Sequence, residues 1–134
     1  MSAPPSLERY RALRAQLATP LPSRYNIAAV TCDRWARGDG RVAMLVPADG
    51  EVREIGFDHF ASSSARLANG LEALGVGRGD RVSICLEQSV ECATAHLAVQ
   101  RLGAIAVPIS TMSGTEAVRH RLVDSGARVL IARF

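Results

Sequence analysis

The sequence contains no lysine, since all sixteen basic residues of the 134-residue chain are arginine. A phosphate-loop lysine, a Schiff-base lysine and a lysine general base are therefore excluded for the residues present. Aromatic residues make up only 4% of the chain, and the arginines are scattered among acidic residues rather than grouped. Nucleic-acid binding needs a basic patch with stacking surfaces, so we predict no nucleic-acid partner and interpret the arginines as a solvated surface.

Long hydrophobic runs are also missing. No apolar stretch approaches the roughly 18 residues that a membrane-spanning helix needs. The first residues, Met1–Ser6, lack the basic end and apolar run of a secretory signal. We therefore expect no membrane span and a cytoplasmic location.

Cysteine is sparse. The chain has three cysteines, which is an odd number: Cys32, Cys85 and Cys92. In a cytoplasmic chain, we interpret them as reduced thiols that serve as small hydrophobic residues. Cys92 and His96 lie four residues apart and would share one face of a helix, which is compatible with zinc. No second pair with ligand spacing accompanies them, so we predict no metal site.

The composition that remains, 48% hydrophobic and 22% charged, is typical of a globular protein, and the length corresponds to about one domain. Apolar residues recur at helical spacing over residues 6–18, and Pro20 and Pro22 follow them. We predict two parts: an N-terminal helix with a proline-rich tether over residues 1–24, and a folded domain over residues 25–134.

The folded domain is predicted to open with a helix over residues 27–37, capped by Asn26. A β-hairpin should follow, with strands over residues 42–46 and 52–57, because Asp49–Gly50 is a strong tight-turn signal.

A longer helix is predicted after the hairpin. Asp58 is suited to cap its first turn, and Phe57 to pack against that turn as a hydrophobic staple. Apolar residues then recur every three or four positions, and Gly75 is placed to end the helix in a left-handed conformation.

From there the pattern alternates regularly between strand and helix. Short glycine turns separate the elements, which favours right-handed crossovers and parallel strands covered by helices on both faces. The predicted strands are residues 82–86, 104–109 and 128–131, and the predicted helices are 90–102, capped by Ser89, and 116–123. The fold class is therefore α/β: a β-hairpin followed by the first strands and helices of a doubly wound, mainly parallel sheet.

The last predicted strand lies close to the end of the sequence. Its apolar residues Val129, Leu130 and Ile131 would form the edge of a small parallel sheet, and a bare apolar edge favours pairing with another chain. We therefore interpret the sheet as cut short and expect possible self-association through this C-terminal edge strand.

Two short segments imitate nucleotide-binding motifs. Gly75–Asp80 is rich in glycine, but it follows a helix and precedes a strand, the reverse of the order that directs phosphate to a helix N-terminus. Thr111–Thr115 lies between a strand and a helix, as a phosphate loop would. Ser113 and Glu116 there match a capping box, which explains the same residues as a helix start. A helix stop and a helix start are the simpler interpretations, although a small nucleotide-binding α/β protein stays an alternative.

At the level of longer segments the chain resembles the adenylate-forming superfamily, in its branch of acetyl- and medium-chain acyl-CoA synthetases. The resemblance runs in unbroken order over about residues 25–134. The segments that carry it are Tyr25–Ala28, Cys32–Ala36, Ile55–Phe60, Leu67–Gly75, Gly79–Val82, Ala95–Pro108 and Arg121–Ala127.

The resemblance implies an AMP-forming ligase, in which a carboxylate reacts with MgATP to give an acyl-adenylate and CoA then displaces AMP. It also implies ATP, Mg²⁺ and CoA for a complete enzyme. The family's phosphate loop ending in Pro-Lys, its ribose-binding Asp and its catalytic Lys have no counterpart in this sequence. We therefore assign no catalytic, cofactor-binding or metal-binding residue, and we expect an inactive N-terminal fragment whose partner is the rest of the parent chain.

A second hypothesis comes from a different class. The chain would be a non-catalytic α/β interaction module that binds a partner's strand along its exposed sheet edge.

Overall fold

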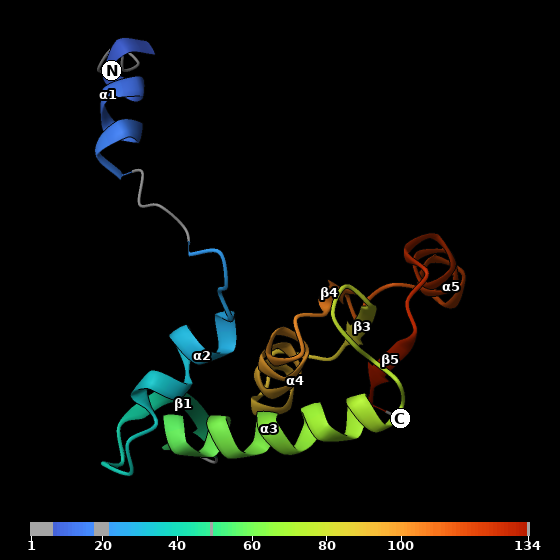
Figure 1. The fold of residues 1–134 in the computed structure, drawn as a ribbon. Helices are drawn as coiled ribbons and strands as arrows, with labels where there is room; N and C mark the ends of the chain where they lie inside the picture. The colour runs from blue at the N-terminus through green and yellow to red at the C-terminus, as the bar shows by residue number, and fades with distance from the viewer. Residues whose placement is uncertain (1–6, 18–21, 49, 134) are drawn as a thin grey trace.

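Residues 7–17, 22–48 and 50–133 are described by a computed structural model (Figure 1). Three parallel strands form the centre of the fold in the order β4-β3-β5, and a separate antiparallel pair is formed by β1 and β2. The strands are β1 (Val42–Ala48), β2 (Glu51–Gly56), β3 (Arg81–Cys85), β4 (Ile105–Pro108) and β5 (Val129–Ala132). The helices are α1 (Leu7–Leu17), α2 (Ile27–Thr31), α3 (Phe57–Ala73), α4 (Val90–Arg101) and α5 (Thr115–Ser125), with a short 3-10 helix η1 (Asp33–Trp35). The predicted fold class is confirmed.

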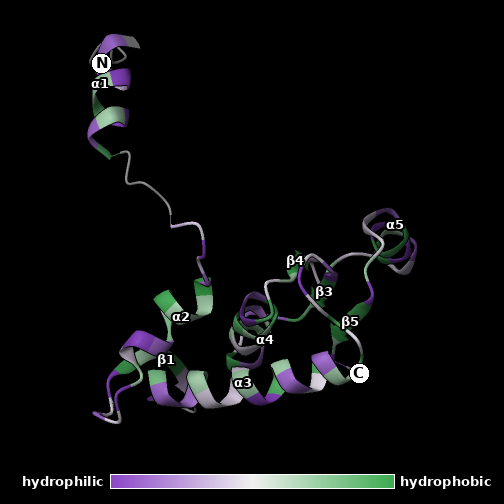
Figure 2. Cartoon of the chain, viewed as in Figure 1, coloured by the Kyte–Doolittle hydropathy of each residue, from purple (hydrophilic) through white to green (hydrophobic). Residues whose placement is uncertain are grey.

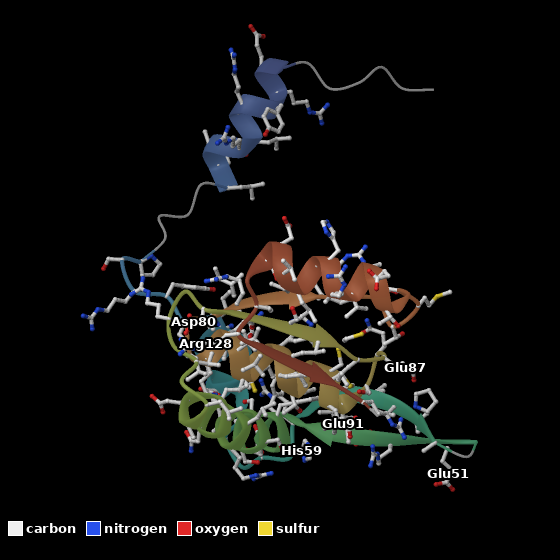
Figure 3. The ribbon with its side chains drawn as sticks, turned by 90° about the vertical axis from the view of Figure 1, so that its right-hand side faces the viewer. Glu51, His59, Asp80, Glu87, Glu91 and Arg128 are labelled. Carbon is white, nitrogen blue, oxygen red and sulfur yellow. The ribbon has the colours of Figure 1, made fainter. Side chains whose placement is uncertain are left out.

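Strand β3 is the centre of the sheet and pairs with β4 on one side and β5 on the other. Val82 and Ile84 lie on one face and Ser83 on the other, and all three are buried. Because β4 and β5 flank β3, crossovers of the usual right hand place α4 and α5 on opposite faces of the sheet. Figure 3 shows this arrangement, with α5 on one side of the strands and α3 and α4 on the other. The chain therefore forms the start of a doubly wound sheet.

The main core lies between this sheet and the pair α3 and α4. Ala95, Ala98 and Val99 of α4 are fully buried against Val82 and Ile84 of β3. Small residues on α4 let the helix approach the sheet closely. The opposite face of the sheet is poorly covered, since α5 has no buried residue and Ile105 and Leu130 are exposed.

The predicted hairpin is confirmed, although Asp49 of its turn lies outside the described residues. Met44 pairs with Ile55, and the ladder contains an irregularity between Val42 and Met44. One face of the hairpin packs with Phe60 of α3 and Val90 of α4 in a second, smaller core. The hairpin is thereby fixed against the N-terminal ends of both helices.

Several predicted helix boundaries are also confirmed. Asn26 caps α2 by accepting a hydrogen bond from the backbone N–H of Ala29, and Ser89 caps α4 by accepting one from Cys92. Gly75 follows α3 with a φ of 83°, as predicted for a left-handed helix stop.

Two predicted caps are wrong. Gly56, not Asp58, is the N-cap of α3, and the Asp58 carboxylate instead accepts a hydrogen bond from the backbone N–H of Gly38. The capping box at Ser113 does not form, because Gly114 is the N-cap of α5 and Glu116 forms an ion pair with Arg119. The donor to Asp58 lies twenty residues away in the sequence, whereas the partner of Glu116 is three residues on in the same helix.

The predicted continuous helix over residues 27–37 is also wrong, because the chain turns inward at the buried Cys32 and restarts as η1. This turn carries Asp33 to Arg101 of α4, whose guanidinium donates to both carboxylate oxygens at 2.7 and 2.6 Å. Arg101 also donates to Ser64 of α3 at 3.0 Å. The Asn26 amide donates to the Arg101 carbonyl at 2.9 Å. The end of the local helix therefore coincides with a long-range ion pair between Asp33 and Arg101.

The predicted N-terminal helix is present as α1, although Ser6, Pro20 and the other residues of 1–6 and 18–21 lie outside the described residues. Figures 1 and 2 show α1 apart from the sheet, with hydrophilic and hydrophobic residues along its length. Tyr10, Leu13 and Leu17 are exposed. No helix in the described part of the chain is both long enough and apolar enough to cross a membrane. The division into parts at residue 24 stays a prediction.

The partly buried ion pair predicts a stability difference. Asp33→Ala should lower the free energy of unfolding by about 1–2 kcal/mol, because it leaves the partly buried Arg101 guanidinium without its carboxylate partner. Arg119→Gln breaks an exposed ion pair on α5 and should change the free energy of unfolding by less than about 0.5 kcal/mol. Urea unfolding of both variants measures the two effects, and equal small losses would contradict the role given to Asp33.

The turn before β3 predicts a pH dependence. Asp80 accepts a hydrogen bond from the Gly77 N–H at 2.8 Å and another from Arg128 at 3.3 Å. These two interactions hold the pKa of Asp80 below its ordinary value of 3.8, and the hydrogen bond from Gly77 has the larger effect. The stabilisation from the charged carboxylate is therefore present above pH 3.8 and is lost as the pH falls through the lowered pKa.

Asp80→Asn should accordingly make the free energy of unfolding depend less on pH at acidic pH. The difference in urea midpoint between parent and variant should shrink as the pH is lowered from 6 to 2. Asp124→Asn, which removes an exposed carboxylate of α5, is the matched control and should leave the shape of the profile unchanged. Parallel profiles for the parent and Asp80→Asn would contradict the assignment.

Candidate functional site

A cleft of about 1000 Å³ lies at the carboxyl ends of β3 and β5. Its walls are the N-terminal half of α3, the first turns of α4, the loop between β3 and α4, and the end of β5. In open α/β sheets, ligands bind at this end of the strands. The cleft is therefore the candidate functional site of the described chain.

The floor of the cleft is apolar. Leu67 of α3, Leu86 after β3, Val90 and Ala95 of α4, and Ile131 of β5 contribute to it. Val90 and Ala95 belong to the packed cores, whereas Leu67, Leu86 and Ile131 are only partly buried. Hydrocarbon surface of this kind favours an apolar occupant.

The rim of the cleft carries charges of both signs, with Glu87, Glu91 and Arg133 all exposed there. Figure 3 shows Glu87 and Glu91 at the end of the sheet away from Asp80 and Arg128. A hydrogen bond from its own backbone N–H lowers the pKa of Glu91, and the Ser89 hydroxyl, Arg53 and Arg133 lower it further. Glu91 is therefore a carboxylate at neutral pH.

The N-terminus of α4 opens onto the cleft, and the chain itself takes part of its donors. The Ser89 hydroxyl accepts from the Cys92 N–H at 3.1 Å, and Glu91 places a carboxylate in the same first turn. A phosphate group here would meet a carboxylate instead of free donors. This end of the helix is therefore poorly suited to bind a nucleotide phosphate.

A histidine and a serine lie on the α3 wall. The His59 ring lies 3.4 Å from the Ser63 hydroxyl, and Arg66 also donates to that hydroxyl. A serine nucleophile needs a histidine that a carboxylate orients. In the part of the chain that the structure describes, no carboxylate bonds to His59, so this pair does not make an activated nucleophile.

The cysteines and their neighbours make no metal centre within residues 7–17, 22–48 and 50–133. No group of three or more His, Cys, Asp or Glu side chains there is placed to hold a metal ion. Cys32 and Cys92 are buried. Burial, with help from the charge of Asp33, raises the pKa of the Cys32 thiol, which keeps it protonated.

The two segments that imitate nucleotide-binding motifs lie at different ends of the sheet. Gly75–Asp80 forms the turn between α3 and β3, at the amino end of the strands and away from the cleft. Of the second segment, Thr111 reaches the cleft, whereas Gly114 caps α5. The sequence assigned no site residue and missed the cleft residues. The usable signal was that parallel strands bring their carboxyl ends, here Cys85 and Ala132, to one edge.

Known proteins match this fold and this order of elements. Residues 31–133 match the family model of the AMP-binding enzymes. The acetyl-coenzyme A synthetase of Coprinopsis cinerea is 37% identical over 108 residues, which are 78% of this chain and 16% of that protein. An acyl-CoA synthetase of Brucella canis superposes with a TM-score of 0.75 at 31% identity, over 90% of this chain and 22% of that one.

A shorter structure also matches. The N-terminal subdomain of Klebsiella oxytoca NpsA superposes with a TM-score of 0.68 at 29% identity, over 80% of this chain and 27% of that one. The chain therefore spans only a small part of the relatives that it matches. The family model, the sequence relatives and the superposed structures agree, and the chain belongs to the family of AMP-binding enzymes.

Proposed function

We propose that this chain is the N-terminal part of the adenylate-forming domain of an AMP-forming acyl-CoA ligase. Such a ligase joins a carboxylate to ATP, releases pyrophosphate, and transfers the acyl group from the adenylate to CoA. The observation that carries the proposal is the match of residues 31–133 to the family, in the same order and with the same fold as acyl-CoA ligases.

The chain's own contribution is structural. The residues present do not fit the phosphates of ATP, because lysine is absent and the cleft rim sets Glu87 and Glu91 against the single Arg133. For Mg²⁺, no group of three or more His, Cys, Asp or Glu side chains in the described residues is placed to hold a metal ion. Catalysis of phosphoryl chemistry requires cations directed at the developing charge. The chain supplies instead an apolar wall at the carboxyl end of the sheet.

The purified chain should therefore be inactive. We expect no ATP–pyrophosphate exchange above the protein-free blank with acetate or with medium-chain carboxylic acids. A synthetase purified in the same way is the positive control. Reproducible exchange that scales with the concentration of this chain would contradict the structural role.

A chimera tests the ligase assignment itself. This chain replaces the 108-residue segment that it matches in the Coprinopsis cinerea synthetase, and acetyl-CoA formation is measured. Because the segment carries the fold and not the reacting groups, activity should stay within about tenfold of the parent, ~1.4 kcal/mol. The synthetase without the segment is the negative control. A soluble, folded chimera with no more activity than this control would oppose the proposal.

The free edge of β5 favours a second function, that of a non-catalytic module which binds a partner's strand. Strand β5 pairs only with β3 in the described residues. An active chimera decides for the ligase, because an unrelated binding module would not complete a synthetase.

A further inference from the structure

The arginine pocket, a second cavity of about 590 Å³, lies at the amino ends of β3 and β4, the opposite end of the strands from the cleft. Three segments line it: residues 23–26 before α2, Arg78 in the turn between α3 and β3, and the C-terminal end of α4. These segments are far apart in the sequence. The fold therefore builds this pocket, and no short motif encodes it.

The arginine pocket is lined by cations without anions. Arg24, Arg78 and Arg101 line it, and no Asp or Glu of the described residues does. Arg24 and Arg78 are exposed and make no hydrogen bond or ion pair with any residue that the structure describes. Arg119 and Arg128, by contrast, each have a carboxylate partner. Two guanidinium groups without a protein partner therefore meet at one concave surface.

The acidic residues near the arginine pocket are already paired. Asp33 accepts hydrogen bonds from both terminal nitrogens of Arg101, so this pair adds no net charge. Asp80, the acidic residue nearest to Arg78 in the sequence, is held by the Gly77 N–H and by Arg128. The Nε of Arg101 is also buried without a hydrogen-bond partner in the described residues. The positive charges of Arg24 and Arg78 are therefore not offset.

The C-terminal end of α4 presents no unbonded carbonyl among its last four. Such carbonyl groups normally carry partial negative charge and would repel an anion. Those of residues 98–100 accept hydrogen bonds from the backbone N–H groups of residues 102–104, and that of Arg101 accepts one from the Asn26 amide. The Gly103 carbonyl accepts from the Gly79 N–H at 3.0 Å. The wall formed by α4 is therefore compatible with a bound anion.

We propose that the arginine pocket binds the phosphate group of a small anionic molecule. Guanidinium groups suit this ligand, because their planar donors form paired hydrogen bonds to phosphate oxygens. The pocket has a volume typical of small-molecule sites, and Tyr25 and Leu102 add apolar surface for an organic group attached to the phosphate. The inference goes beyond the proposed function and does not depend on it, because the arginine pocket and the cleft lie at opposite ends of the strands.

A phosphate bound between Arg24 and Arg78 would connect two parts of the chain. Arg24 lies on the segment that joins α1 to α2, whereas Arg78 belongs to the turn that enters the central strand β3. The ligand would therefore hold the segment that carries α1 against the amino end of the sheet. Binding should protect the backbone beside Arg24 from a protease.

Isothermal titration of the purified chain tests the site with two probes, inorganic phosphate and phenyl phosphate, each of which carries about two negative charges at neutral pH. At low ionic strength, phenyl phosphate should bind with a dissociation constant below about 1 mM. Arg24→Gln and Arg78→Gln should each weaken binding at least about tenfold, because each removes a charge-assisted contact. Arg119→Gln, which removes an exposed arginine of α5, is the matched control and should change the dissociation constant by less than about twofold.

The two probes distinguish the sources of the phosphate. Tighter binding of phenyl phosphate than of inorganic phosphate, with the difference lost in Tyr25→Ala, identifies the ligand as an organic phosphate. Equal binding of the two probes identifies free phosphate as the ligand. The absence of saturable binding of either probe below about 10 mM overturns the inference. Equal weakening by Arg119→Gln and Arg78→Gln also overturns it, because the attraction then comes from the overall charge of the protein.

Trypsin gives an independent readout, because it cleaves the chain after Arg24. Phenyl phosphate at about ten times its dissociation constant should slow cleavage of the Arg24–Tyr25 bond at least about fivefold. Cleavage of the exposed Arg37–Gly38 bond is the internal control and should not change. In Arg78→Gln, which keeps Arg24, the protection should be lost while the urea midpoint stays close to the parent's. Protection that persists in Arg78→Gln contradicts a phosphate shared by the two arginines.

Discussion

Strand β3 and its two parallel neighbours determine the rest of the structure. Val82, Ser83 and Ile84 are buried, and the backbone hydrogen bonds of β3 are shared between β4 and β5. A parallel strand of this kind needs helices on both faces, because water cannot reach its backbone or its side chains. The helices α3 and α4 meet this need on one face, whereas α5 covers the other only loosely. The position of the cleft follows from the same three strands, because their carboxyl ends lie together.

The uneven cover of the sheet connects stability with function. On the well-packed side, alanines of α4 approach β3 closely and an ion pair joins η1, α3 and α4. On the opposite side, Ser83 keeps a buried hydroxyl without a partner in the described residues, and Leu130 is exposed. A sheet with one well-packed face and one loosely covered face is suited to form part of a larger domain. Its chemistry agrees with that role, since the cleft has an apolar floor and its rim sets two carboxylates, Glu87 and Glu91, against the single guanidinium of Arg133.

Arginine takes structural roles in this chain that reach across long sequence separations. Arg101 binds a carboxylate through two parallel hydrogen bonds, and Arg81 donates to the carbonyls of Ser125 and Gly126 behind α5. A guanidinium is suited to such sites because it has several donors in a fixed plane. Some of the arginines therefore bind the ends of helices and turns, in addition to the arginines that form a solvated surface.

The sequence by itself determined the elements whose signals are local. Hydrophobic periodicity located the helices and strands, Asn26 and Ser89 located two caps, and the resemblance over residues 25–134 indicated the family. The boundary at Cys32 and the partner of Asp58 escaped prediction, because each depends on a donor or acceptor that another segment supplies. The cleft escaped for the same reason, since Leu67, Val90 and Ile131 are far apart in the sequence. The start of α5 was mispredicted for a local reason, since Arg119 of the same helix takes the Glu116 carboxylate that a capping box needs. Local spacing fixes which backbone hydrogen bonds form within an element, whereas strand order and long-range pairing decide which side chains meet. The sequence also predicted an edge strand over Val129–Ile131, whereas only the tertiary structure could show that Pro108 occupies an outward position on the opposite edge.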